Sequence, residues 1–230
     1  MMSISQKQEN QRLAEQTAQE RVAFALSEWK PGIVLSSSFG AQSAVLLHMV
    51  TQQWPEIPII LLDTQYLFPE TYQFIDELTE RLHLNLHVYQ SPLSREWQEA
   101  RHGKLWEDGV VGISEFNRIN KVEPMTRALR ELSAQAWITG VRRGQSSTRS
   151  ALETLSLQDD IVKVHPIYDW TNKDVHLYLT ENHLPYHPLW YEGYVSIGDV
   201  QTSRPLTADL TEEETRFFGL KRECGLHQVK

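Results

Sequence analysis

Apolar positions along the chain follow two alternating patterns, which predict strands and helices in turn. Short runs of consecutive or alternating apolar residues are typical of buried strands. Five such runs predict strands at residues 33–35, 57–62, 84–89, 136–139 and 161–164. Apolar residues at a spacing of three or four predict helices at residues 6–29, 41–51, 70–82, 93–102, 124–134 and 171–182. A further acid-rich helix is expected at 211–218, and Thr171 is a suitable cap for the helix that follows it.

Alternation of strands and helices predicts the fold class. It is typical of an α/β protein with a mainly parallel twisted sheet and helices on both faces. We expect a single domain over residues 1–230, divided into an N-terminal helix (1–30), an α/β core (31–183) and a C-terminal appendage (184–230) that ends in a mobile tail. No apolar run is long enough for a bilayer span and the N-terminus is polar, so we expect a cytoplasmic protein.

The charge distribution favours a small anionic ligand over a nucleic acid. The formal net charge is −8, which opposes broad binding to a polyanion. Basic residues nevertheless cluster locally, at Arg142, Arg143 and Arg149, and again at Lys221 and Arg222. An acidic protein with a local basic pocket suits a small phosphorylated molecule.

Polar residues follow three of the predicted strands, at 36–43, 63–64 and 140–149. Parallel sheets bind ligands beyond the carboxyl ends of their strands, so these segments predict one site. In Ser36-Ser37-Ser38-Phe39-Gly40-Ala41-Gln42-Ser43, hydroxyls, loop amides and a helix start could together hold a phosphate. Gly40 would let the backbone approach that phosphate closely. An ordinary polar turn capped by serine remains the alternative, and the segment matches neither the Walker loop nor the dinucleotide fingerprint.

The chain contains a single cysteine, Cys224, close to its end. It cannot form an internal disulfide, which agrees with a reducing cytoplasm. Lys221 and Arg222 would favour the nucleophilic thiolate. The alternative is a surface cysteine without chemistry.

Five segments, in order, resemble the phosphoadenylyl-sulfate (PAPS) reductases of sulfate assimilation, within the Rossmann-like adenine nucleotide alpha-hydrolase-like superfamily. They are Ser36 to Ser43, Leu62-Asp63-Thr64, Lys121-Val122-Glu123-Pro124-Met125, Gly140 to Ser146, and Glu223-Cys224-Gly225-Leu226-His227. The resemblance covers nearly the whole chain. The Lys-Val-Glu-Pro segment and the terminal segment are the most diagnostic parts of it.

The resemblance implies a reaction. Cys224 would attack the sulfur of PAPS, release adenosine 3′,5′-bisphosphate and become S-sulfocysteine. Thioredoxin or glutaredoxin would then free sulfite. The resemblance also implies a homodimer.

The same resemblance, together with the clusters above, gives a set of expected site residues. Cys224 is the expected nucleophile. Substrate contacts are expected from Ser36, Ser37, Ser38, Phe39, Gly40, Gln42, Ser43, Asp63, Thr64, Lys121, Arg142, Arg143, Arg149, Arg204, Lys221, Arg222 and His227.

Several of these assignments have alternatives. Arg142 and Arg143 are adjacent and should point apart, so one of them could be structural. Arg149 could pair with Glu153 instead. Asp63 could cap the next helix or bind magnesium.

Related adenylyl-sulfate reductases carry four cluster-binding cysteines, and none is present here. Phe116, Asn117, Asp199 and Thr202 stand at their positions. We therefore expect no bound cofactor and no iron–sulfur cluster, since such a cluster needs thiolates. This pattern resembles the enzymes that use the 3′-phosphorylated substrate.

Three other functions stay open at this point: a cluster-free adenylyl-sulfate reductase, an ATP-pyrophosphatase-type nucleotidyl enzyme on the same fold, and a non-catalytic nucleotide-binding module. Gln42 weakens the second, because synthetases of that type usually carry an acidic residue there.

Overall fold

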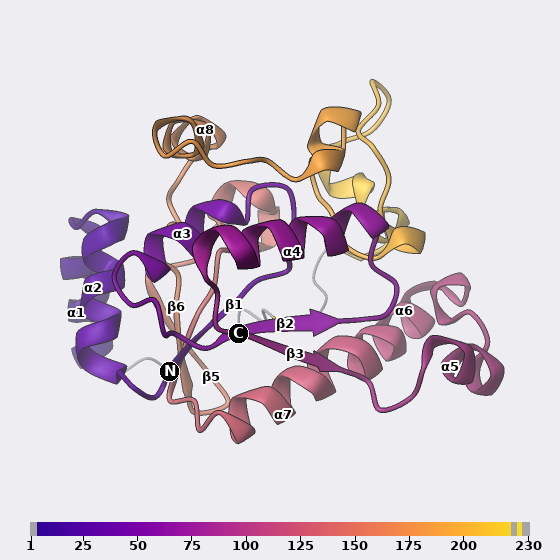
Figure 1. The fold of residues 1–230 in the computed structure, drawn as a ribbon, viewed down its shortest axis with the longest axis horizontal. Helices are drawn as coiled ribbons and strands as arrows, with labels where there is room; N and C mark the ends of the chain where they lie inside the picture. Colours follow the sequence, from indigo (N-terminus) through magenta and orange to yellow (C-terminus); the bar gives the residue numbers. More distant parts are fainter. Residues whose placement is uncertain (1–3, 222–224, 227–230) are drawn as a thin grey trace.

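The structure, a computed structural model, describes residues 4–221 and 225–226. Within them the chain forms a six-stranded sheet with the strand order β3-β2-β1-β4-β6-β5 (Figure 1). The strands are β1 (Ile33–Ser36), β2 (Ile59–Asp63), β3 (Leu86–Gln90), β4 (Ala136–Ile138), β5 (Leu155–Gln158) and β6 (Ile161–Val164). Neighbouring strands are parallel except β5, which is antiparallel to β6. The mainly parallel α/β sheet predicted from the sequence is therefore confirmed.

The edge strand β5 was not predicted. It pairs with β6 in a tight hairpin whose two turn residues, Asp159 and Asp160, have φ angles of 50° and 65°. Two successive residues with positive φ match the twist of a two-residue hairpin, and aspartate tolerates that conformation better than most residues. Leu155-Ser156-Leu157 is too short a pattern to separate a strand from a loop by periodicity.

Eight α-helices lie in the described part of the chain. They are α1 (Ile4–Ala14), α2 (Ala18–Trp29), α3 (Ala44–Thr51), α4 (Pro69–Leu82), α5 (Arg95–His102), α6 (Gly109–Asn117), α7 (Glu123–Glu131) and α8 (Asn172–Glu181). The Thr171 cap is confirmed, since its hydroxyl accepts a hydrogen bond from the amide of Asp174.

The single N-terminal helix expected at 6–29 is wrong. The chain forms two helices, α1 and α2, because Thr17 starts a new one: its side chain accepts from the amide of Glu20, and the Glu20 carboxylate accepts from the Thr17 amide. This reciprocal capping satisfies donors that a helix start leaves free.

Helix α6 was also missed, because its sequence has glycines at both Gly109 and Gly112 and no clear polar face. A π-helical turn, Arg118–Val122, joins α6 to α7. Such turns insert an extra residue into a helical path and are frequent at functional sites. Here the turn carries Lys121.

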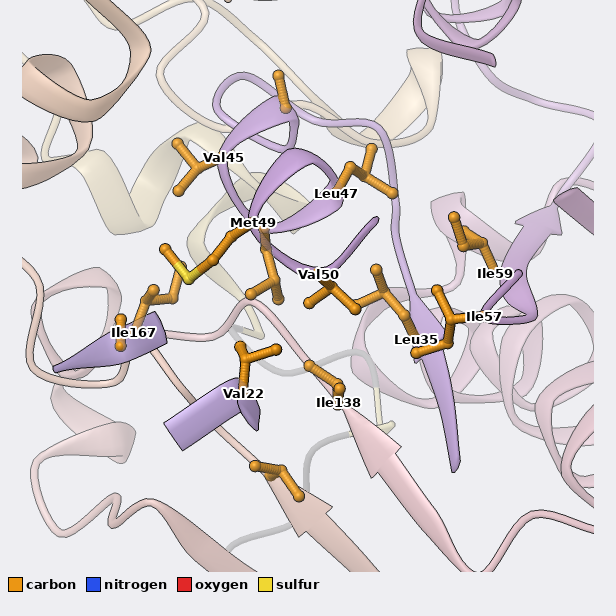
Figure 2. Packing of buried hydrophobic residues seen from close by; sticks show 14 of the residues in the cluster. Val22, Leu35, Val45, Leu47, Met49, Val50, Ile57, Ile59, Ile138 and Ile167 are labelled. Carbon is orange, nitrogen blue, oxygen red and sulfur yellow. The ribbon is translucent and has the colours of Figure 1, made fainter. Parts of the chain in front are cut away.

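The helices cover both faces of the sheet. In Figure 1, α3 and α4 lie over one face and α7 lies beneath the other. Figure 2 shows the larger core, in which Met49 and Val50 of α3 share one buried cluster with Leu35 and Ile138 of the strands. A smaller cluster on the opposite face joins α7 to β1, β2, β3 and β4. The sheet is thus buried on both sides, as parallel sheets are.

The region after residue 184 has little regular structure. The helix expected at 211–218 is wrong: two short 3₁₀ segments, Glu212–Thr215 and Phe217–Gly219, occur instead. Phe217 and Phe218 have φ angles of 48° and 57°, which a helix cannot contain. This segment, orange to yellow in Figure 1, lies toward the end of the sheet at which β2 and β3 point. Across the described residues, none of the helices has the length and apolar character needed to cross a bilayer.

Candidate functional site

A cavity of about 350 Å³ opens beyond the carboxyl ends of β1 and β4. Strands β2 and β3 lie on one side of β1, whereas β4, β6 and β5 lie on its other side. The connections therefore diverge at β1 and β4, and the crevice at such a switch point is where open parallel sheets bind ligands. The volume falls within the range of small-molecule sites.

The serine-rich loop after β1 forms one wall of this cavity. Ser36, Ser37 and Ser38 all line it. The Ser36 hydroxyl accepts a hydrogen bond from the indole nitrogen of Trp137, at 2.6 Å, and the Ser37 hydroxyl accepts one from the amide of Phe39. These bonds fix the first two hydroxyls before any ligand arrives.

The turn of this loop depends on Phe39 and not on Gly40. Phe39 has a φ of 48° and its side chain is fully buried in the core, so only its backbone belongs to the loop. A Cβ on Gly40 would meet its nearest described neighbours at 3.4 Å and 3.5 Å, which is ordinary contact. The protein itself therefore does not require glycine at position 40.

Ser43 and the start of α3 face the same space. The Ser43 hydroxyl is buried, lines the cavity and makes no hydrogen bond within the described residues. It precedes Ala44, the first residue of α3, and makes no side-chain cap. A buried hydroxyl without a partner is costly, and an anion at this helix start would satisfy it.

Arg142 crosses the cavity from the segment after β4. Its guanidinium donates to the Gln42 side chain at 2.6 Å and to the Asn172 side chain at 3.0 Å. Burial lowers the pKa of Arg142, and the carboxylates of Glu212 and Asp174 partly offset that effect. The guanidinium is charged and desolvated, so an anionic ligand would stabilise it.

The neighbouring arginines differ in orientation. Arg143 is exposed, donates to the carbonyl of Leu152, lies over the Tyr168 ring and does not line the cavity. Arg149 does line it, and donates to the Gln145 side chain at 2.9 Å. The expectation that Arg142 and Arg143 point apart is confirmed.

A buried ionic group lies at the opposite wall. The Lys121 ammonium donates to one carboxylate oxygen of Asp199 at 2.6 Å, and the Thr64 hydroxyl donates to the other at 2.5 Å. Burial alone would raise the pKa of Asp199, but the charges of Lys121 and Arg216 and these two hydrogen bonds lower it. Asp199 is therefore an ionised carboxylate that holds Lys121 at the cavity wall.

The sequence analysis did not identify Arg216 as a site residue. It lines the cavity and reaches it across Gly198, where any Cβ would lie only 2.2 Å from the guanidinium nitrogen Nη2. An isolated pairing of Ser203 with Arg216 anchors its backbone. Neither local pattern nor motif spacing reveals such a contact, since it joins residues that are distant in the sequence.

Some expected residues lie elsewhere. Asp63 accepts from the Gln65 amide and the Tyr72 hydroxyl, Arg204 donates to the carbonyl of Glu214, and Lys221 donates to the Ser114 hydroxyl. None of these three side chains lines the cavity. Their proposed contacts with substrate have no support in this geometry. Asp63 does not cap the next helix either, since the N-cap of α4 is Phe68 and no side chain caps that helix start.

Cys224, Arg222 and His227 lie outside the described residues. The described residues nearest to the cysteine in sequence are Lys221, Gly225 and Leu226. Leu226 lines the cavity together with the serine-rich loop, so part of the terminal motif belongs to this site.

The four residues that stand where the resemblance places cluster cysteines of adenylyl-sulfate reductases are buried. Phe116, Asn117, Asp199 and Thr202 are each at most 2% exposed. Asp199 belongs to the ionic group described above, and Phe116 packs against Tyr66 and Trp106. Among residues 4–221 and 225–226, no group of three His, Cys, Asp or Glu residues could hold a metal ion.

His165 is buried and does not line the cavity. Its two ring nitrogens lie 3.1 Å from the Thr139 hydroxyl and 3.0 Å from the Ser156 hydroxyl. Burial, with the nearby charges of Lys163 and Arg149, lowers the pKa of His165 to about 3. Both ring nitrogens of His165 are therefore paired inside the fold, which gives this residue a structural role.

Together, the cavity presents hydroxyls, a helix start and four cationic side chains around an apolar interior that includes Leu46, Leu62 and Ile167. Such a surface suits a molecule with several negative charges and one flat apolar part. A phosphorylated nucleoside has this composition.

Comparisons with known proteins agree with this chemistry. Residues 32–205 match the model of the phosphoadenosine phosphosulfate reductase domain. The chain is 61% identical over 217 residues to a phosphoadenosine 5′-phosphosulfate reductase of Alkalilimnicola ehrlichii, which covers 94% of this chain and 89% of the relative. It is 62% identical over 218 residues to the Shewanella oneidensis protein of the same name, with 95% and 89% covered.

Solved structures give the same result. The crystal structure of a phosphoadenylyl-sulfate reductase from Candida auris, a phosphate complex, superposes with a TM-score of 0.77 at 30% identity, covering 89% of this chain and 98% of that one. An FMN adenylyltransferase from Candida glabrata has a TM-score of 0.63 at 16% identity, over 89% of this chain and 70% of its own, which shows a shared fold alone. By sequence and by structure, then, this chain belongs to the phosphoadenosine phosphosulfate reductase family.

Proposed function

We propose that this protein reduces PAPS to sulfite and adenosine 3′,5′-bisphosphate in sulfate assimilation, through a covalent intermediate on Cys224. One observation carries the proposal most strongly. Leu226, two residues after the only cysteine, lines the same cavity as Ser36, Ser37 and Ser38. The terminal motif and the phosphate-binding loop therefore contribute to one site.

The site residues have distinct roles in this proposal. The loop after β1, with the Ser43 hydroxyl and the start of α3, binds phosphate oxygens through hydrogen bonds. Arg142, Lys121 and Arg216 supply positive charge at the cavity wall. Charge-assisted hydrogen bonds of this kind are stronger than neutral ones and stabilise the negative charge that develops on the leaving phosphate.

The first chemical step is a displacement at sulfur. The Cys224 thiolate attacks the sulfuryl group, a sulfur–sulfur bond forms, and the bond from sulfur to the bridging phosphate oxygen breaks. The oxygen leaves with the electron pair as adenosine 3′,5′-bisphosphate, and Cys224 becomes an S-sulfonate. A basic neighbourhood supports this step, because the thiolate is the nucleophile.

The second step needs two electrons from an external dithiol, for which we propose reduced thioredoxin or glutaredoxin. One thiolate of the donor attacks the Cys224 sulfur, sulfite leaves with the electron pair, and a mixed disulfide forms. The second donor thiolate then attacks its partner sulfur and restores the Cys224 thiolate. The donor ends as a disulfide, so atoms and electrons balance.

The remaining parts of the proposal follow the family. We propose a homodimer that works in the cytoplasm without a bound cofactor or iron–sulfur cluster. The preference for the 3′-phosphorylated substrate is supported by the names of relatives about 60% identical to this chain. The basic residues around the cavity agree with a substrate that carries an additional phosphate.

Mass spectrometry tests the covalent step directly. The protein is mixed with PAPS in the absence of any thiol donor, and the peptide that contains Cys224 is weighed. We expect one added sulfonate on this peptide and none in the Cys224→Ser variant. Sulfite release by the Cys224→Ser variant with thioredoxin supplied would refute the proposal.

A parallel assay addresses the nucleotidyl alternative. The neighbouring adenylyltransferase structure shares the fold at low identity, so ATP is the substrate to try. We expect no pyrophosphate release from ATP with magnesium. Release at a rate comparable with sulfite formation would support the alternative instead.

A further inference from the structure

Lys163 is a buried lysine on the strand next to the edge strand β5, far from the serine-rich loop in sequence. It lies on β6 and is only 3% exposed. Its ammonium donates to the backbone carbonyl of Leu226 at 2.8 Å and to the Gln158 side chain at 2.9 Å. Burial of a lysine is costly unless each donor finds an acceptor, so these contacts hold the side chain in place.

Leu226 lies against a face of the sheet that offers both apolar side chains and the Lys163 ammonium. Val34, Trp137 and Lys163 are in register across β1, β4 and β6 and share this face. Helix α7 packs over β2 and β3 on the same side. Leu226 packs against this apolar cluster, beside Met125 of α7, and so helps to cover the part of the sheet near β4.

Trp137 links this contact to the nucleotide loop. The Lys163 ammonium lies 4.2 Å from the centre of the Trp137 rings, and the indole nitrogen of Trp137 donates to the Ser36 hydroxyl. A cation over an indole face is attracted to it, most strongly when both are desolvated. The Leu226 carbonyl, Lys163, Trp137 and Ser36 thus form one continuous chain of contacts.

We propose that Lys163 is a positioning residue that seats the terminal motif at the nucleotide cavity. The seat consists of Lys163, Trp137 and the apolar cluster under Leu226. It holds the backbone two residues beyond Cys224, and therefore limits where the thiol can reach. The effect of the seat on catalysis rests on the proposed function. The hydrogen bond between Lys163 and Leu226 does not depend on that function.

The single cysteine makes the seat measurable without any substrate. Iodoacetamide can label only Cys224, and the proposal requires that this thiol react faster once Leu226 leaves the seat. The alkylation rate of the free protein is therefore the quantity to measure. Lys163→Met keeps the aliphatic stem over Trp137 and removes the hydrogen bond to Leu226. We expect alkylation to become faster by about tenfold, the equilibrium factor for losing one charged hydrogen bond.

Two controls separate seating from general loosening of the sheet. Gln158→Met removes the other acceptor of Lys163 but keeps the Leu226 contact, and Lys173→Met removes an exposed lysine on α8. Both should alkylate at the wild-type rate. Lys163→Arg retains a cationic donor and should recover part of the protection. Wild-type alkylation in Lys163→Met, or equal acceleration in Gln158→Met, would overturn the proposal.

A second measurement connects the seat to the reaction. In a single turnover with PAPS and no thiol donor, Lys163→Met should slow sulfonation of Cys224, while its affinity for adenosine 3′,5′-bisphosphate stays unchanged. A loss of affinity with an unchanged sulfonation rate would contradict a positioning role. If wild-type protein shows no sulfonate on Cys224, the proposed function fails, and faster alkylation of Lys163→Met still supports the seat.

Discussion

The ion pair between Lys121 and Asp199 offers a direct test of the electrostatics of the site. Asp199 is fully buried and Lys121 is 8% exposed, so neither charge is stabilised by bulk water. Asp199→Asn keeps the size of the side chain but removes the negative charge. It would leave Lys121 buried beside a neutral amide, with Arg216 adding a second positive charge close by.

The size of the effect follows from what the substitution removes. Two hydrogen bonds to a carboxylate, from Lys121 at 2.6 Å and from Thr64 at 2.5 Å, become bonds to a neutral group or are lost. Removing one partner of a buried pair costs about 3 to 5 kcal/mol, because an uncompensated charge remains. We expect Asp199→Asn to lower the free energy of unfolding by about 3 kcal/mol.

Urea unfolding followed by tryptophan fluorescence measures this loss. Asp76→Asn, on the exposed side of α4, is the matched control and should stay within about 0.5 kcal/mol of wild type. The double variant Lys121→Met with Asp199→Asn should be more stable than Asp199→Asn alone, since it removes the orphaned ammonium. The reasoning is refuted if Asp199→Asn costs less than about 1 kcal/mol, or if the double variant is no more stable than the single one.

Acid gives an independent check on the same pair. The pKa of Asp199 is lowered in the folded protein, so its contribution is present above the ordinary carboxylate pKa. That contribution is lost as the pH falls through the lowered pKa. Asp199→Asn should therefore lack this part of the acid-induced loss of stability.

Three further predictions concern separate parts of the molecule. Arg142→Met should weaken binding of adenosine 3′,5′-bisphosphate by roughly tenfold or more in calorimetry, because the ligand loses a charge-assisted hydrogen bond from a guanidinium. Arg143→Met, beside it but outside the cavity, should bind normally. Because the pKa of His165 is lowered to about 3, the free energy of unfolding should decrease as the pH falls from about 6.5 toward 3, and His165→Gln should lose less stability over this range. An equal loss of stability in both proteins would contradict this prediction. Thr17→Ala removes the α2 cap and should cost about 1 kcal/mol in urea unfolding, with no change in nucleotide affinity.

The parallel sheet and most of its helices could be predicted because local periodicity follows from burial on both faces. Ile59, Ile60 and Leu61 form a continuous apolar run, as a strand that is buried on both faces requires. The edge strand β5 and helix α6 could not, since a four-residue strand and a glycine-containing helix carry weak patterns. Their positions depend on contacts with β6 and with the Arg118–Val122 turn.

The sequence likewise predicted those site residues that have a local signal and missed those that depend on distant contacts. The loop after β1 and Arg142 could be identified because strand ends and basic clusters are local features of the sequence. Asp199 was noticed only as a replacement for cysteine, and its ion pair with Lys121 joins positions 78 residues apart. Arg216 had no local signal at all, because its place in the cavity depends on the absence of a side chain at Gly198.

The two glycines at this cavity differ in the space that each has for a side chain. Gly40, in the serine-rich loop after β1, has room for a methyl group, so a requirement for glycine there would come from a bound ligand. At Gly198 one added carbon would occupy space already taken by the Arg216 guanidinium, which would have to leave its place at the cavity wall. Alanine at position 40 should therefore leave the empty site intact and test contact with the ligand alone, whereas alanine at position 198 should move a cationic side chain.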